Sequence, residues 1–183
     1  MAIFARVLRL IGRAELYVSV ALLLLIVVSI SAQVVLRYGW NAPVRWVEEA
    51  STASLIWITF LAGSLIYKEE AHIRIWLPLQ KASSRLARYV PLLVGNAVVL
   101  LAAAIIILNA TPVIAVENRS LTTSLPIALP RGWVFSIPVL VGFVSIAASA
   151  VFFILRDLVA IAGGAAGQLS IAPFKAHEPV EEL

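Results

Sequence analysis

The residues best suited to chemistry are a pair of carboxylates, Glu48 and Glu49, and a histidine, His72, which follows two further glutamates and precedes Arg74. Paired carboxylates can serve as general acid and base, and a histidine beside acidic residues can bind a metal. Simpler explanations exist for both. Carboxylates complement the positive end of a helix, and a metal site needs three or more well-placed ligands. We therefore predict no catalytic residue, no metal site and no enzyme.

The sequence also lacks the motifs of the common cofactor-dependent and hydrolytic enzymes. It contains no P-loop, no Gly-x-Gly-x-x-Gly, no His-Glu-x-x-His and no Gly-x-Ser-x-Gly. The two histidines, His72 and His177, lie outside the long apolar runs, whereas a haem held between membrane helices needs histidines within them. We expect no cofactor in this chain.

The composition indicates a membrane protein. The 183 residues are 62% hydrophobic and only 13% charged, with a mean hydropathy of +1.00. Soluble domains carry about 25% charged residues, so this chain could not cover a soluble surface. The net charge of +4 comes from basic residues placed between apolar runs, which indicates membrane topology rather than nucleic-acid binding.

Four runs without charged residues are long enough to cross a bilayer as helices: 16–36, 50–67, 89–116 and 132–155. We predict an all-α integral membrane protein with four transmembrane helices in a single domain, 1–183, and a flexible tail from about residue 163. Charges inside membrane spans usually mark ion and proton pathways. Their absence from these runs argues against a self-contained pump, exporter or intramembrane protease.

The basic residues predict the orientation. With the N-terminus inside the cell, ten of the 14 Lys and Arg residues lie on the cytoplasmic side, so both termini are expected there. The stretches 3–13 and 79–89 alternate basic and apolar residues at helical spacing. We predict short amphipathic helices at the inner lipid surface for both.

The start of the second span carries the most ordered pattern. Asn41 could cap that helix, Pro43 fits its first turn, and Trp46 suits the headgroup level. Polar and small residues then recur on one helix face: Glu48, Thr52, Thr59 and Gly63. Such a stripe permits close helix approach. It fits either an interface with another subunit or internal packing, and the sequence leaves both open.

Two asparagines, Asn96 and Asn109, lie within the third run. An amide side chain in a span is most simply explained by hydrogen bonds to a neighbouring helix. We predict that both connect helices.

The chain resembles the small membrane subunit of TRAP transporters, the tripartite ATP-independent periplasmic uptake systems of bacteria and archaea. The four spans and the chain length fit that family throughout. The specific likeness is narrower and consists of Asn41-x-Pro43-x-x-Trp46-x-Glu48-Glu49, then Gly63 in the second span and His72-Ile73 in the inner loop.

The resemblance implies a division of labour. A soluble periplasmic protein captures an organic acid such as a C4-dicarboxylate or sugar acid. A large multi-span permease subunit carries it across the cytoplasmic membrane with sodium, and the small subunit anchors the fixed part of the large one. The substrate and sodium sites belong to the large subunit, so none is expected here.

The resemblance also suggests roles for individual residues. Glu48 and Glu49 would bond to the large subunit or brace the outer loop, Gly63 would permit close helix approach, and His72 and Arg74 would fix the inner loop. The alternative is a structural or assembly subunit of another membrane complex, such as a respiratory enzyme.

Overall fold

The computed structural model describes residues 1–69, 85–162 and 171–173. In chain order, its helices are α1 (Ala2–Gly39), α2 (Trp46–Lys68), α3 (Arg85–Glu117), α4 (Arg131–Phe135) and α5 (Ile137–Ile161). Four helical segments, the last formed by α4 and α5 together, are long and apolar enough to cross a membrane. Each contains one of the predicted spans, so the predicted all-α fold with four spans is confirmed.

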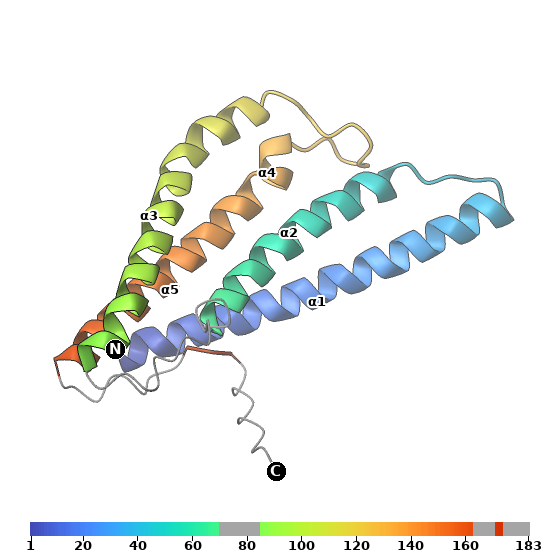
Figure 1. Cartoon of the computed structure of the whole chain (residues 1–183). Helices are drawn as coiled ribbons and strands as arrows, with labels where there is room; N and C mark the ends of the chain where they lie inside the picture. The colour runs from blue at the N-terminus through green and yellow to red at the C-terminus, as the bar shows by residue number, and fades with distance from the viewer. Residues whose placement is uncertain (70–84, 163–170, 174–183) are drawn as a thin grey trace, which may run out of the picture.

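Prolines shape the second half of the chain. α3 contains Pro91 and Pro112, and its ribbon curves along its length (Figure 1). A proline inside a helix removes one backbone hydrogen bond, which is a usual cause of bending. Pro138 lies at the start of α5, where its missing N–H costs nothing, and Ser136 separates α4 from α5.

The helices are arranged as a fan (Figure 1). α1 packs along α2, α3 packs along α5, and α2 joins the two pairs through α5. The helices converge where α1 begins and α2 and α5 end; we call this the narrow end. They spread toward the connections α1–α2 (40–45) and α3–α4 (118–130), which form the wide end.

The hydrophobic core lies at the narrow end. The first part of α1 crosses the ends of α2 and α5 there, and an edge-to-face aromatic contact joins Phe4 to Phe152 with ring centroids 5.7 Å apart. Ile171, from the described part of the C-terminal segment, is fully buried in the same core. The sequence reading did not anticipate that these tail residues pack against the bundle. The outer part of α1 has few neighbours within the chain, and most of its apolar side chains are exposed.

Three expectations about local structure need correction. The stretch 3–13 is not a separate interfacial helix, because α1 runs without a break from Ala2 to Gly39. Pro43 is not in the first turn of α2, which begins at Trp46. Asn41 does not cap α2: the residue preceding the helix is Arg45, with no side-chain cap bond. Asn41 instead adopts a positive φ of 53°, which asparagine tolerates better than most residues, and so reverses the chain after α1. The second interfacial helix, predicted at 79–89, lies largely outside the described residues.

Candidate functional site

The stripe on α2 faces away from the bundle. The buried residues of α2 lie on the side of the helix opposite to the stripe. They are Val47, Ser54, Leu61, Ser64, Tyr67 and Lys68. Glu48, Thr52 and Thr59 are exposed, together with Leu55 between them. Internal packing therefore does not account for the stripe. Its role as a subunit interface stays a prediction.

The two threonine hydroxyls of this stripe are already satisfied by the helix. Thr52 donates its hydroxyl hydrogen to the Glu48 carbonyl oxygen at 2.9 Å, and Thr59 donates to the Leu55 carbonyl oxygen at 2.8 Å. At Gly63, a Cβ would meet no atom within 4 Å. From Thr52 to Gly63 the side chains of the stripe are therefore small or hydrogen-bonded to their own helix, and a second helix could approach them without leaving a buried donor unpaired.

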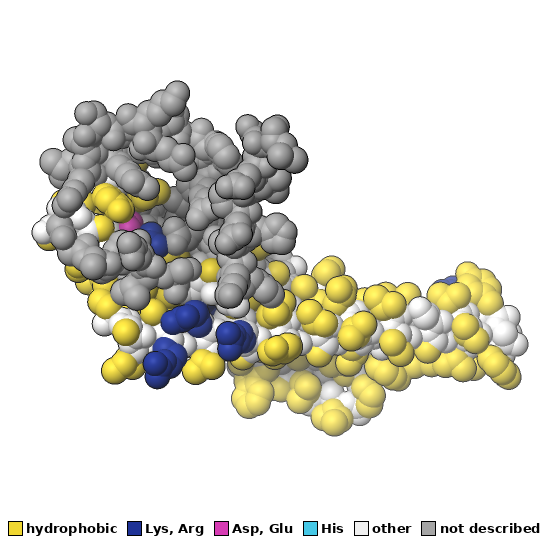
Figure 2. Space-filling model, turned by 90° about the horizontal axis from the view of Figure 1, so that it is seen from below, with side chains coloured by type: hydrophobic (Ala, Val, Ile, Leu, Met, Phe, Trp, Pro, Cys, Tyr) yellow, Lys and Arg dark blue, Asp and Glu magenta, His cyan; other side chains and the backbone are white. Residues whose placement is uncertain are grey.

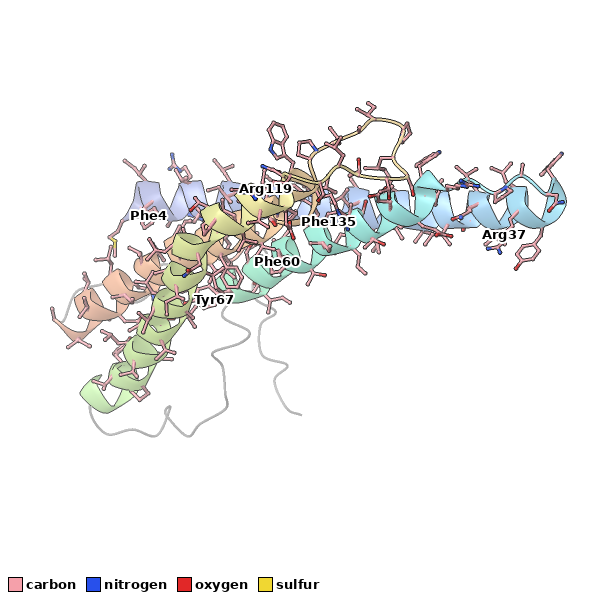
Figure 3. The ribbon with its side chains drawn as sticks, turned by 90° about the horizontal axis from the view of Figure 1, so that it is seen from above. Phe4, Arg37, Phe60, Tyr67, Arg119 and Phe135 are labelled. Atoms are coloured by element: carbon pink, nitrogen blue, oxygen red, sulfur yellow. The ribbon has the colours of Figure 1, made fainter. Side chains whose placement is uncertain are left out.

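The close helix approach inside the bundle occurs at a different glycine. A Cβ on Gly142 of α5 would lie 2.9 Å from both the Cβ and the carbonyl oxygen of Phe60 on α2. Phe60 also packs against Phe143, with ring centroids 6.1 Å apart. Figure 3 labels Phe60 and Tyr67 on α2, and both make their aromatic contacts with α5. The α2–α5 contact that joins the two helix pairs therefore depends on Gly142 rather than on Gly63.

The two glutamates at the start of α2 behave differently. The Glu49 carboxylate accepts hydrogen bonds from three consecutive backbone N–H groups of the α3–α4 connection, those of Thr123 (3.3 Å), Ser124 (2.6 Å) and Leu125 (3.1 Å). Glu48 is exposed and takes no part in this arrangement. Glu49 thus braces the wide end by fastening the loop 118–130 to α2.

The other predicted residues of the wide end lie on its surface. Asn41, Pro43 and Trp46 are exposed, as are Tyr38 and Trp40 nearby. Exposed aromatic rings at a helix end suit the headgroup layer of a bilayer. His72 and Arg74 fall in 70–84, outside the described residues.

A buried ionic cluster ties three helices together at the narrow end. The Lys68 ammonium of α2 donates to the Glu15 carboxylate of α1 at 2.5 Å and to the Ser145 hydroxyl oxygen of α5 at 2.7 Å. Ser145 in turn donates to the other Glu15 oxygen at 2.5 Å. Lys68 is 0% exposed and Glu15 is 6% exposed. This closed triangle is what a buried ion pair needs, because each charge has its partner and an additional hydrogen bond.

A second polar cluster lies beside the first and brings in α3. The Tyr67 hydroxyl donates to the Asn96 side-chain oxygen at 2.9 Å, and the Asn96 amide donates to the Asp157 carboxylate at 3.2 Å. Arg156 forms an ion pair with Asp157 at 3.1 Å, and its guanidinium lies 4.8 Å from the centre of the Phe153 ring. Asn96 therefore connects helices as predicted.

Asn109 does not connect helices of this chain in the described structure. It is exposed, and its side-chain amide donates to the Ile105 carbonyl oxygen of its own helix at 2.7 Å. Among the described residues, no group of three or more His, Asp or Glu side chains is arranged to hold a metal ion.

The sequence reading missed the buried charges for a simple reason. The spans were delimited by charged residues, so Glu15, Lys68 and Asp157 were placed outside them by construction. The helices continue past these residues. One signal in the sequence could have revealed the buried ion pair: the opposite charges of Glu15 and Lys68 lie at the same end of two consecutive antiparallel spans.

Comparison with known proteins agrees with this architecture. A sequence model of the DctQ component of tripartite ATP-independent periplasmic transporters matches residues 26–160. A TRAP transporter small permease protein of Haemophilus influenzae is 31% identical over 71 residues, which is 39% of this chain and 44% of that protein. The chain thus aligns with less than half of the relative's length. Because the family match covers most of the chain, from within the first span to the end of the fourth, the protein belongs to the DctQ family, the small membrane component of TRAP transporters.

Proposed function

We propose that this chain anchors the large permease subunit of a TRAP transporter during sodium-coupled, binding-protein-dependent uptake of an organic acid, such as a C4-dicarboxylate or a sugar acid. The chain supplies a fixed membrane scaffold and carries neither the substrate nor the sodium. Its partners are the large multi-span permease subunit, the periplasmic binding protein and membrane lipids. The family assignment leaves no support for the alternative, a subunit of a respiratory complex.

The observation that carries this proposal is the outward-facing stripe of α2. Leu55 and the small or hydrogen-bonded residues Thr52, Thr59 and Gly63 line a surface on which the bundle places nothing. Membrane helices associate chiefly through close packing, which small residues permit. A helix of the large subunit seated here would cover a surface that is already satisfied in hydrogen bonding.

The narrow end supports the scaffold role. The cluster of Glu15, Lys68 and Ser145 joins α1, α2 and α5, and the cluster around Asn96 joins α2, α3 and α5. Hydrogen-bonded charges in a low-dielectric interior resist separation, because each would be left unpaired. Such a bundle suits the part of a transporter that stays still.

Copurification of the two membrane subunits tests the interface. Gly63→Leu fills open space, so the isolated chain should unfold at the wild-type temperature, yet the recovery of the large subunit should fall at least tenfold. Leu108→Phe, which enlarges an exposed residue of α3, is the matched control and should leave recovery unchanged. Glu48→Gln should also weaken recovery. Wild-type recovery and uptake with Gly63→Leu would exclude this face of α2.

The orientation can be tested separately. The chain contains no cysteine, so single cysteines can be introduced without background labelling. In the bacterial cytoplasmic membrane, a cysteine replacing Ser124 should react with a membrane-impermeant maleimide in intact spheroplasts. A cysteine replacing His177 should react only after lysis. The reverse pattern would overturn the proposal that both termini are cytoplasmic.

The transport role requires the complete system. The purified two-subunit complex, reconstituted in liposomes with its binding protein, should take up the acid only with an inward sodium gradient. Uptake by the large subunit alone at the same rate would refute an anchoring role for this chain.

A further inference from the structure

The first turns of α1 present three distinct faces. The residues that pack into the bundle are Ala5, Leu8, Gly12 and Glu15. The arginines Arg6, Arg9 and Arg13 are exposed and, at 3.6 residues per turn, lie within an arc of about 60°. A third face is apolar and exposed, and the arginines lie between it and the face that packs into the bundle. It consists of Ile3, Val7, Leu10 and Ile11.

The three arginines form a concentrated positive surface. Together with Leu10 they line a shallow depression on the side of α1. Figure 2 shows Lys and Arg side chains gathered near the beginning of α1, whereas the rest of that helix is almost entirely hydrophobic. The surface spans about 10 Å along the helix axis, at 1.5 Å per residue.

No described residue of the chain neutralises these charges. Within the described segments, the ion pairs are Lys68 with Glu15 and Arg156 with Asp157, and neither involves this surface. The acidic residue closest in sequence, Glu15, is turned inward to Lys68. Arg9 donates a long hydrogen bond, 3.5 Å, to the Ala5 carbonyl oxygen of its own helix. With respect to the described residues, the surface is therefore available to an external anion.

The apolar face beside the arginines indicates that the bound anion is a component of the membrane. Ile3 is 79% exposed, and Val7 and Leu10 are also exposed, which would be unfavourable in water. α1 has 38 residues and is about 57 Å long, more than the 40–45 Å of a bilayer with its headgroups. An inclined α1 would place this apolar face at the edge of the acyl chains and the arginines among the headgroups.

We propose that Arg6, Arg9 and Arg13 form a binding surface for the phosphate groups of anionic phospholipids. Guanidinium groups pair with phosphate oxygens through two parallel hydrogen bonds, and the adjacent apolar face would contact the acyl chains of the same lipids. A soluble anion or an acidic peptide would leave that apolar face uncovered. The segment precedes the family match, which begins at residue 26, and the proposal does not depend on the transport function.

Lipid binding to the full chain in an uncharged detergent provides the test. Native mass spectrometry would follow the binding of phosphatidylglycerol and, separately, of phosphatidylcholine. Each arginine near an anionic lipid contributes roughly fivefold, so Arg6→Gln/Arg9→Gln/Arg13→Gln should weaken phosphatidylglycerol binding by about a hundredfold. Phosphatidylcholine carries the same phosphate but no net charge, so its binding should fall far less.

The matched control removes the same charge elsewhere. Arg37, Arg45 and Arg119 are exposed, and Arg37 and Arg119 lie at the wide end of the molecule (Figure 3). Their triple replacement by Gln should change phosphatidylglycerol binding less than about threefold, the effect of a weak general attraction.

Three results would overturn the proposal: wild-type binding by the Arg6/Arg9/Arg13 variant, equal losses in both triple variants, or loss of an acidic protein partner with lipid binding intact. If the Gln variant fails to fold, the corresponding triple Lys variant keeps the charge but not the paired hydrogen bonds. It should bind phosphatidylglycerol several-fold more weakly than the wild type, and unchanged binding would refute phosphate recognition by these arginines.

Discussion

Removing one member of the buried ion pair should destabilise the bundle strongly. Lys68→Met keeps the length of the side chain but leaves the Glu15 carboxylate buried without its cation. Breaking a buried pair in this way costs about 3–5 kcal/mol. Ser145 still donates to Glu15, so we expect a loss near the lower end of that range.

A double-mutant cycle measures the interaction free energy between Glu15 and Lys68 directly. Glu15→Gln alone should also destabilise, because Lys68 would keep only a neutral partner. Combining Glu15→Gln with Lys68→Met removes both charges, so that neither charge is left buried without its partner. The double variant should therefore be at least about 2 kcal/mol more stable than the sum of the single effects predicts.

Unfolding in mixed micelles with increasing SDS, followed by circular dichroism, measures these free energies. Thermal unfolding gives a second measure, with an expected drop of about 6–20 °C for Lys68→Met. Arg119→Gln, an exposed change of charge, should stay within about 0.5 kcal/mol of the wild type. Strictly additive effects of the two replacements would refute the reasoning, because they would mean that Glu15 and Lys68 do not interact.

Two further predictions concern the wide end and the α2–α5 contact. Glu49→Gln weakens the acceptor for the three backbone amides of 123–125, so hydrogen exchange at those amides should accelerate at least tenfold. Glu48→Gln is the control and should leave the exchange rate unchanged. Equal protection of the three amides in both variants would contradict the bracing role of Glu49. Gly142→Ala places a Cβ 2.9 Å from α2 atoms and should destabilise the chain by about 1–3 kcal/mol, measured by SDS unfolding. Gly63→Ala, in open space, is its control, and a similar loss there would show that crowding is not the cause.

The number and type of elements could be predicted from the sequence because the membrane imposes them. Twenty or so apolar residues without charge must form a helix, since no water is available to satisfy the backbone. The spans 16–36, 50–67 and 89–116 therefore lie within single helices, and 132–155 is divided only at Ser136. The fan-shaped arrangement could not be predicted, because it depends on contacts such as that between Gly142 and Phe60.

The residues of the candidate site were only partly predictable. The stripe from Glu48 to Gly63 was recognisable as one helix face, but periodicity alone does not say whether a face points inward or outward. Glu49 was recognised as a helix-start carboxylate, whereas its acceptance of three loop amides depends on the folding of a connection about 75 residues later in the chain. The buried charges at Glu15 and Lys68 escaped notice because charge was taken as the sign of a helix end.

The order of synthesis gives the narrow-end cluster a further consequence. Glu15 and Lys68 are 53 residues apart in sequence, and Glu15 and Ser145 are 130 residues apart. During translation the carboxylate enters the membrane boundary long before its ammonium partner, and the hydroxyl that completes the triangle arrives only with α5. A chain interrupted before α5 therefore carries an incompletely satisfied ion pair. Closure of the triangle therefore requires that α1, α2 and α5 have all been synthesised.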